Sequence, residues 1–113
     1  MRIFVSYTTR NNEVTESSLL ALSNKLSCFG NVFIDLLNND SVDKQKRIVT
    51  ELNICNLLVL IESASSNCSE WVRFELSTAN ELNIPIVILP VNSIDNLTSA
   101  DLEHKLRPSL SFT

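Results

Sequence analysis

Five consecutive apolar residues, Leu57–Ile61, constrain the fold of this chain more than any other feature of its sequence. A strand with one solvent-exposed face alternates apolar and polar side chains, so a run without alternation predicts a strand that is buried on both faces. Strands of this kind lie inside parallel sheets that helices cover on both sides. The segment Asn56–Ile61 therefore predicts the centre of a three-layer α/β domain.

Further apolar runs predict the other strands of this sheet at Arg2–Ser6, Asn31–Ile34 and Ile86–Leu89. A short run at Ser109–Phe112 is a candidate for a fifth strand. With right-handed crossover connections, the strands form a parallel sheet of four or five strands in the order 2-1-3-4-5, as in flavodoxin-like domains. A single domain accounts for residues 1–113, which is an ordinary domain size.

Apolar residues at three- and four-residue intervals predict helices between the strands. The first ends at Gly30, whose conformational freedom suits a left-handed turn. The second covers Val42–Asn53 with Ser41 as its cap, the third covers Ser69–Leu82, and a last helix is expected over Ser99–Leu106. The core-facing residues of the third helix are expected to be Val72, Leu76 and Ala79.

Composition and strand ends exclude several function classes. With one glycine in the chain, neither the Gly-x-Gly-x-x-Gly dinucleotide turn nor a P-loop can be built in its usual form. The first strand ends in Ser6 and Tyr7 and the third in Glu62 and Ser63, whereas a phospho-accepting receiver domain needs acidic Mg²⁺ ligands at both places. A net charge of −4 and scattered basic residues argue against a nucleic-acid partner.

The length of the apolar runs, the pattern of the first residues and the spacing of the cysteines indicate the cellular location. No run approaches the roughly 20 residues needed to cross a bilayer, and the first residues do not have a signal-peptide pattern. We therefore expect a cytoplasmic location without membrane contact. The three cysteines lack Cys-x-x-Cys spacing, which indicates thiols rather than a disulfide framework, and no metal site is expected.

Four segments together resemble the Toll/interleukin-1 receptor (TIR) domain family. Ile3–Tyr7 is similar to the family's first strand, which ends in Ser-Tyr, and Asn31–Asp35 is similar to its second strand with a terminal acid. Asn56–Ser63 resembles the strand that ends in serine, and Ser69–Leu76 resembles the helix that carries Trp-x-x-x-Glu. The resemblance runs from about residue 3 to residue 91, so the chain reads as a single TIR-like domain.

The resemblance implies one of two roles. TIR enzymes cleave the nicotinamide–ribose bond of NAD⁺ to ADP-ribose or cyclic products, with NAD⁺ as substrate and no further cofactor, in signalling or defence. Their catalytic glutamate maps onto Glu75. The alternative is a non-enzymatic adaptor that acts through TIR–TIR contacts. A nucleoside deoxyribosyltransferase would also place a glutamate above a parallel sheet, although its usual glycine-rich turn is absent from Ser66–Glu70.

The chemistry of Trp71 and Glu75 can be considered apart from the family. A spacing of four residues places the two side chains on one helical face, which we expect to lie beside the apolar stripe. Cleavage of an N-glycosidic bond with a cationic leaving group builds positive charge on the ribose and needs a nearby carboxylate shielded from water. Trp71 would then supply a flat aromatic surface for stacking. The other interpretation is a surface glutamate beside a half-buried tryptophan.

Residues after the first two strands are candidates for substrate binding. Tyr7, Thr8 and Thr9 follow the first strand, at the carboxyl edge of the sheet where open α/β folds bind ligands. Arg10 is a candidate for a phosphate contact, although the enzymes that the chain resembles often carry a basic residue where it has Thr8. Asp35 ends the second strand and is expected to orient the loop that follows.

The loop at residues 36–44 has neither a glycine nor an aromatic residue, whereas the TIR enzymes commonly carry a glycine there and sometimes an aromatic that covers the ligand. The site of a monomer is therefore expected to be open. The resemblance implies closure by a neighbouring domain in a head-to-tail homo-oligomer. We expect Leu36, Leu37 and Val42 to make that contact; the alternative is that they pack onto their own domain.

Overall fold

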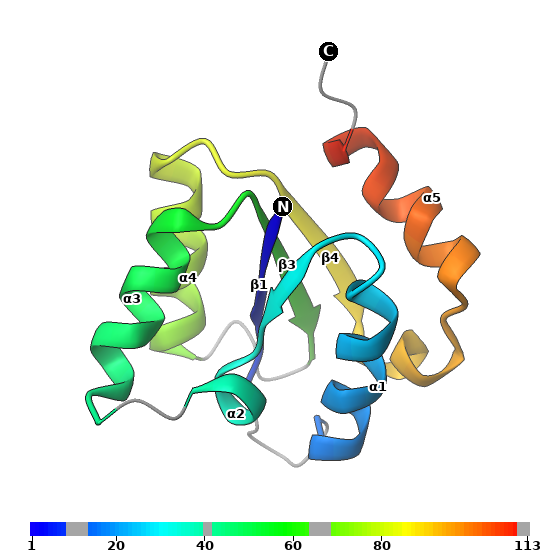
Figure 1. Ribbon diagram of the computed structural model, residues 1–113, viewed down its shortest axis with the longest axis horizontal. Coiled ribbons are helices and arrows are strands. Elements are labelled where there is room, and N and C mark those ends of the chain that lie inside the picture. Colours follow the sequence, from blue (N-terminus) through cyan, green and yellow to red (C-terminus); the bar gives the residue numbers. More distant parts are fainter. Residues whose placement is uncertain (9–13, 40–41, 64–68, 111–113) are drawn as a thin grey trace.

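A computed structural model describes residues 1–8, 14–39, 42–63 and 69–110, and these residues form one four-stranded parallel sheet with helices on both faces (Figure 1). The strands have the order β2-β1-β3-β4, which confirms the predicted order 2-1-3-4. Their bounds are β1 Arg2–Ser6, β2 Asn31–Phe33, β3 Leu57–Glu62 and β4 Ile86–Pro90.

Two helices cover each face of the sheet, as Figure 1 shows. On one face lie α1 (Glu16–Leu26) and α5 (Ser99–Leu110), and on the other lie α3 (Lys44–Ile54) and α4 (Glu70–Glu81). Two short elements complete the described chain, the helix α2 (Asp35–Asn38) after β2 and the 3-10 helix η3 (Val91–Asn96) after β4.

The central strand β3 divides the core into two parts, which explains its unbroken apolar sequence. Leu57, Val59 and Ile61 pack in the cluster that contains the inner residues of α1 and α5. Leu58 and Leu60 pack in the other cluster, with the inner residues of α3 and α4. Each face of β3 thus supports a different helical layer, as the sequence predicts.

Several helix ends differ from the predicted ones. The cap of α3 is Asp43, which accepts a hydrogen bond from the Lys46 N–H, so the prediction of Ser41 as the cap was wrong. Ser69 caps α4 as predicted and accepts from the Val72 N–H. Residues 35–38, predicted to be a loop, form α2.

Gly30 has a different role from the predicted one. It does not adopt a positive φ, whereas Asn83, just after α4, does. A side chain at Gly30 would place its Cβ 2.4 Å from the carbonyl oxygen of Met1. The same carbonyl accepts a hydrogen bond from the Asn31 N–H at the start of β2. Glycine is therefore needed because the two chain segments approach closely where β1 and β2 begin to pair.

Two further predictions need correction. Within Ser109–Phe112, residues 109 and 110 belong to α5 and residues 111–112 lie outside the described part of the chain, so the described sheet has no fifth strand. Leu76 is only partly buried, because another residue of α4 takes the core position. None of the helices in the described ranges has the length and apolar character needed to cross a membrane.

The two-sided packing of β3 predicts a large cost for Leu58→Ala. Leu58 is completely buried, and its truncation leaves a cavity, so the free energy of unfolding should fall by about 2–5 kcal/mol. Chemical denaturation followed by circular dichroism measures this change. Leu20→Ala on α1 is the control, because Leu20 is 53% exposed and should change stability by less than about 0.5 kcal/mol. Equal effects of the two substitutions would contradict the layer arrangement.

Candidate functional site

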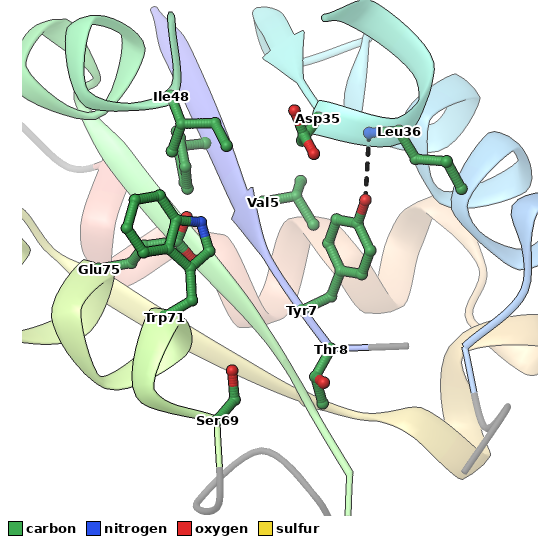
Figure 2. Close-up of a pocket in the computed structure, with 10 residues that line it drawn as sticks. Val5, Tyr7, Thr8, Asp35, Leu36, Ile48, Ser69, Trp71 and Glu75 are labelled. Carbon is green, nitrogen blue, oxygen red and sulfur yellow. Dashed lines mark hydrogen bonds between the residues drawn. The ribbon is translucent and has the colours of Figure 1, made fainter. Parts of the chain in front are cut away.

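A pocket of about 320 Å³ lies at the carboxyl ends of β1 and β2, where parallel α/β sheets bind ligands. The chain after β1 contributes Tyr7 to its lining, α2 contributes Asp35, and α4 contributes Trp71 and Glu75. Figure 2 shows the two residues of α4 on one side of the pocket and the residues of α2, with Tyr7, on the other. The side chain of Val5, from β1, lies between them.

Glu75 is buried, and the residue is only 4% exposed. Together with Val72 and Ala79 it forms the buried stripe of α4, with the three- and four-residue spacing of one helical face. The Ser6 hydroxyl, at the end of β1, donates a hydrogen bond of 2.8 Å to Glu75 Oε1. The expectation that Glu75 lies beside the stripe was therefore wrong. Leu76, predicted to lie in that stripe, packs against the core cluster but is only partly buried.

The surroundings of Glu75 alter its acidity. Burial raises the pKa of its carboxyl from 4.5 to about 7, because the charged form loses hydration. The hydrogen bond from Ser6 favours the ionised form and limits this rise, and the negative charge of Asp35 adds to it. Glu75 therefore changes its charge near neutral pH, a property that clusters at functional sites.

Tyr7 connects β1 to α2. Its phenol oxygen accepts a hydrogen bond of 3.1 Å from the Leu36 N–H, one of the first-turn donors that have no partner within a helix (Figure 2). Burial raises the pKa of Tyr7 to about 12, with the negative charges of Asp35 and Glu75 acting in the same direction. The phenol therefore stays neutral at physiological pH.

Asn39 fixes Asp35 at the edge of the pocket. The buried Asn39 side chain donates from Nδ2 to Asp35 Oδ1 over 2.6 Å and to the Lys44 carbonyl oxygen over 3.0 Å. The Ile34 N–H donates to Asn38 Oδ1 at 2.8 Å, across the same short helix. These bonds hold α2 against the start of α3, so Asp35 sits on a well-supported element.

Trp71 and Phe74 form a stacked pair on the outer side of α4. Their ring centroids are 5.2 Å apart and the rings are inclined by 16°. Trp71 is 38% exposed and Phe74 is 41% exposed. Of the two residues, Trp71 lines the pocket and Phe74 does not. The indole that lines the pocket is thus held in a stacked contact with Phe74.

The structure brings most of the predicted site residues together. Tyr7, Thr8, Asp35, Trp71 and Glu75 all line the pocket. Two predicted binding residues, Thr9 and Arg10, lie outside the described part of the chain.

The predicted contact residues differ from one another. Leu36 is half exposed and lines the pocket, and Val42 is fully exposed. Leu37 is partly buried and packs against the core cluster that contains the inner residues of α1. Of these three residues, Leu36 and Val42 are the most exposed to a neighbouring molecule.

Sequence reasoning does not identify Ile48 or Ser69 as pocket residues, and it does not identify Ser6 as the partner of Glu75. Ile48 and Ser69 reach the lining from α3 and from the cap of α4. Ser6 is buried at the end of an apolar strand, and its partner is 69 positions away. A serine that completes a buried strand needs a hydrogen-bond partner, and this requirement is the one pattern in the sequence that points to it.

The comparisons with known proteins leave the chain unassigned. No protein-family model matches it, and no curated protein matches it. Among the described residues, no three His, Cys, Asp or Glu side chains converge in a way that could hold a metal ion.

Because the carboxyl group of Glu75 is buried, we predict that the difference in free energy of unfolding between wild type and Glu75→Gln changes with pH. Because the folded-state pKa of about 7 lies above the ordinary 4.5, protonated Glu75 favours the folded state. The stabilisation of the folded state by protonated Glu75 is complete below about pH 4.5 and is lost as the pH rises through about 7. At about 1.4 kcal/mol per pH unit, wild type should lose about 3 kcal/mol relative to the variant between about pH 4 and about pH 8.

Urea unfolding of both proteins over this pH range measures the effect. Glu81→Gln, an exposed position on the same helix, is the matched control and should follow wild type. A stability difference between wild type and Glu75→Gln that stays constant with pH would show that the carboxyl group is hydrated.

Proposed function

We propose that the chain is a TIR-like NAD⁺ nucleosidase and that the pocket is its active site. The observation that carries this proposal is the buried carboxylate of Glu75, which shares the pocket with the indole of Trp71. A volume of about 320 Å³ lies at the small end of the range for ligand sites. It suits the nicotinamide ring and its ribose, with the rest of the dinucleotide extending outward.

In the proposed reaction, the bond between ribose C1′ and the ring nitrogen breaks, and its electron pair goes to the nitrogen. Nicotinamide leaves as a neutral molecule, and positive charge develops on the ribose. The ionised carboxylate of Glu75 stabilises this charge from a position that does not need to reorganise. Water then adds to C1′ and releases a proton, which gives ADP-ribose. Capture by a group of the same substrate molecule would give a cyclic product instead.

Neighbouring residues have distinct roles in this proposal. Ser6 holds Oε1 of Glu75 and so sets the orientation of the carboxylate. Trp71 offers its indole as a stacking surface for the nicotinamide ring. Tyr7 remains a neutral phenol and positions α2 through its bond with Leu36.

The energetic cost of Glu75 favours an active site over a purely structural role. An apolar residue in the buried stripe would pack without any desolvation penalty, whereas an ionised carboxylate there destabilises the fold. Residues that reduce stability in this way are common where a protein needs their chemistry.

The second candidate function is a non-enzymatic TIR-like interaction module. The exposure of Leu36 and Val42 favours it, because large apolar side chains on a surface often mark protein contacts. In that case Trp71 and Glu75 serve packing only, and the purified chain releases no nicotinamide.

We predict that Glu75→Gln lowers nicotinamide release from NAD⁺ by at least about 100-fold, because the amide cannot stabilise a developing positive charge. Chromatography of free nicotinamide from purified protein measures the rate, and a parallel reaction with a deoxynucleoside detects any release of free base. Glu81→Gln should stay within about twofold of wild type. A folded Glu75→Gln protein with an undiminished rate would exclude Glu75 as the catalytic residue.

We further propose that self-association activates the enzyme through Leu36 and Val42. Val42→Asp should lower activity per chain and self-association together while the domain stays folded, because Val42 makes no core contact. Leu37→Asp should instead reduce stability, because Leu37 packs against the core. Activity per chain over a wide dilution series, with sedimentation of the same samples, tests this contact. A flat activity profile would rule it out.

A further inference from the structure

Two carboxylates face the pocket from opposite sides. Glu75 reaches it from α4 and Asp35 from α2, as Figure 2 shows. Their charges interact, because the negative charge of Asp35 contributes to the raised pKa of Glu75 and also to that of Tyr7. The space between the two sides therefore lies in a negative electrostatic field when both groups are ionised.

The position of Asp35 is set by the protein and does not depend on a ligand. One carboxylate oxygen, Oδ1, accepts the 2.6 Å hydrogen bond from the buried Asn39 side chain. The next residue, Leu36, is tied to β1 through the phenol of Tyr7. The charge of Asp35 is consequently held at the wall of the pocket, where it acts on whatever enters.

Aromatic groups stand beside these charges. The indole of Trp71, which is stacked on Phe74, lines one side of the pocket, and Tyr7 adds a neutral phenol on the other side. Aromatic faces attract cations, and carboxylates attract them more strongly. A planar ring that carries a positive charge therefore gains stacking and Coulomb attraction together, whereas a neutral ring of the same shape gains only stacking.

We propose that Asp35 is a specificity-determining residue that, with Glu75, makes the pocket select positively charged pyridinium rings over neutral rings of the same shape. This selection acts on the ring itself and requires neither ribose nor phosphate. The inference rests on the proposed function for the location of the site, but it concerns binding and is measured without any reaction.

Selection by charge also affects the release of the product. Cleavage of the glycosidic bond returns the electron pair to the ring nitrogen, so the ring loses its charge at that step. The neutral ring is then held only by stacking and leaves more easily than the charged substrate. A reduced dihydronicotinamide ring is neutral as well, so the same two carboxylates discriminate between the oxidised and reduced cofactor.

The test uses 1-methylnicotinamide and nicotinamide as a pair of probes. The first carries a positive charge and a methyl group in place of the ribose, so it has no glycosidic bond to break, and the second is neutral. Trp71 is the single tryptophan of the chain, so its fluorescence reports binding at the pocket wall. Saturable quenching is measured above the linear collisional quenching of N-acetyltryptophanamide by the same probes.

In wild type, we expect the Kd of 1-methylnicotinamide to be at least about tenfold lower than that of nicotinamide. Asp35→Asn should reduce this ratio by about five- to tenfold and leave the Kd of nicotinamide within about twofold. Asparagine keeps an oxygen that can accept the hydrogen bond from Asn39, so the variant changes charge with little change in shape. Glu81→Gln removes an equal charge at a distant exposed position and should keep the wild-type ratio.

Equal Kd values for the two probes in wild type, or no saturable quenching by either, would overturn the proposal. So would a folded Asp35→Asn protein with an unchanged ratio. If that variant does not fold, the wild-type ratio at low and high salt replaces it: the ratio should fall as salt screens the carboxylates, and a constant ratio would overturn the proposal. Selective binding of 1-methylnicotinamide without nicotinamide release from NAD⁺ would support this inference while rejecting the nucleosidase function.

Discussion

The hydrogen bond between Ser6 and Glu75 joins the end of β1 to the inner face of α4, at a place where the fold would be more stable with two apolar side chains. The single hydrogen bond from Ser6 compensates only part of the hydration that the carboxylate loses on burial. The remaining desolvation cost of the charged form raises the pKa of Glu75. The pocket depends on this arrangement. Trp71 and Asp35 line the same pocket as Glu75, whose carboxyl group is held in place by the protein interior. The charge of that carboxyl group contributes to the electrostatic potential in the pocket.

The fold could be predicted because its strongest determinants are local. The run Leu57–Ile61 places alternate side chains into two helical layers, so it identifies the central strand without knowledge of its neighbours. The short helix α2 could not be predicted, because four residues are too few to show a period. The role of Gly30 could not be predicted either, since it depends on the carbonyl of Met1, a contact that exists only when β1 and β2 pair.

Sequence patterns identify several residues that line the pocket, but not the physical character of the pocket. Tyr7 and Asp35 follow neighbouring strands, and the spacing of Trp71 and Glu75 places them on one side of a helix. The burial of Glu75 could not be inferred, because the adjacent Leu76 offers an apolar alternative for the core position and sequence reasoning prefers it. The partial burial of Leu37 could not be inferred either, because its packing against the core cluster exists only in the folded chain.

The pocket joins a titrating carboxylate to aromatic surfaces and a second fixed charge, and each feature suits a ring that carries positive charge. The central claim is that Glu75 is a buried carboxyl group whose ionisation responds to such a ring. Carbon-13 NMR of labelled glutamate side chains, with the Glu75 resonance assigned by its loss in Glu75→Gln, measures this ionisation directly. We expect a titration midpoint of about 7 that moves to lower pH when 1-methylnicotinamide is added. A midpoint at the ordinary value of 4.5, unmoved by the cation, would contradict the claim.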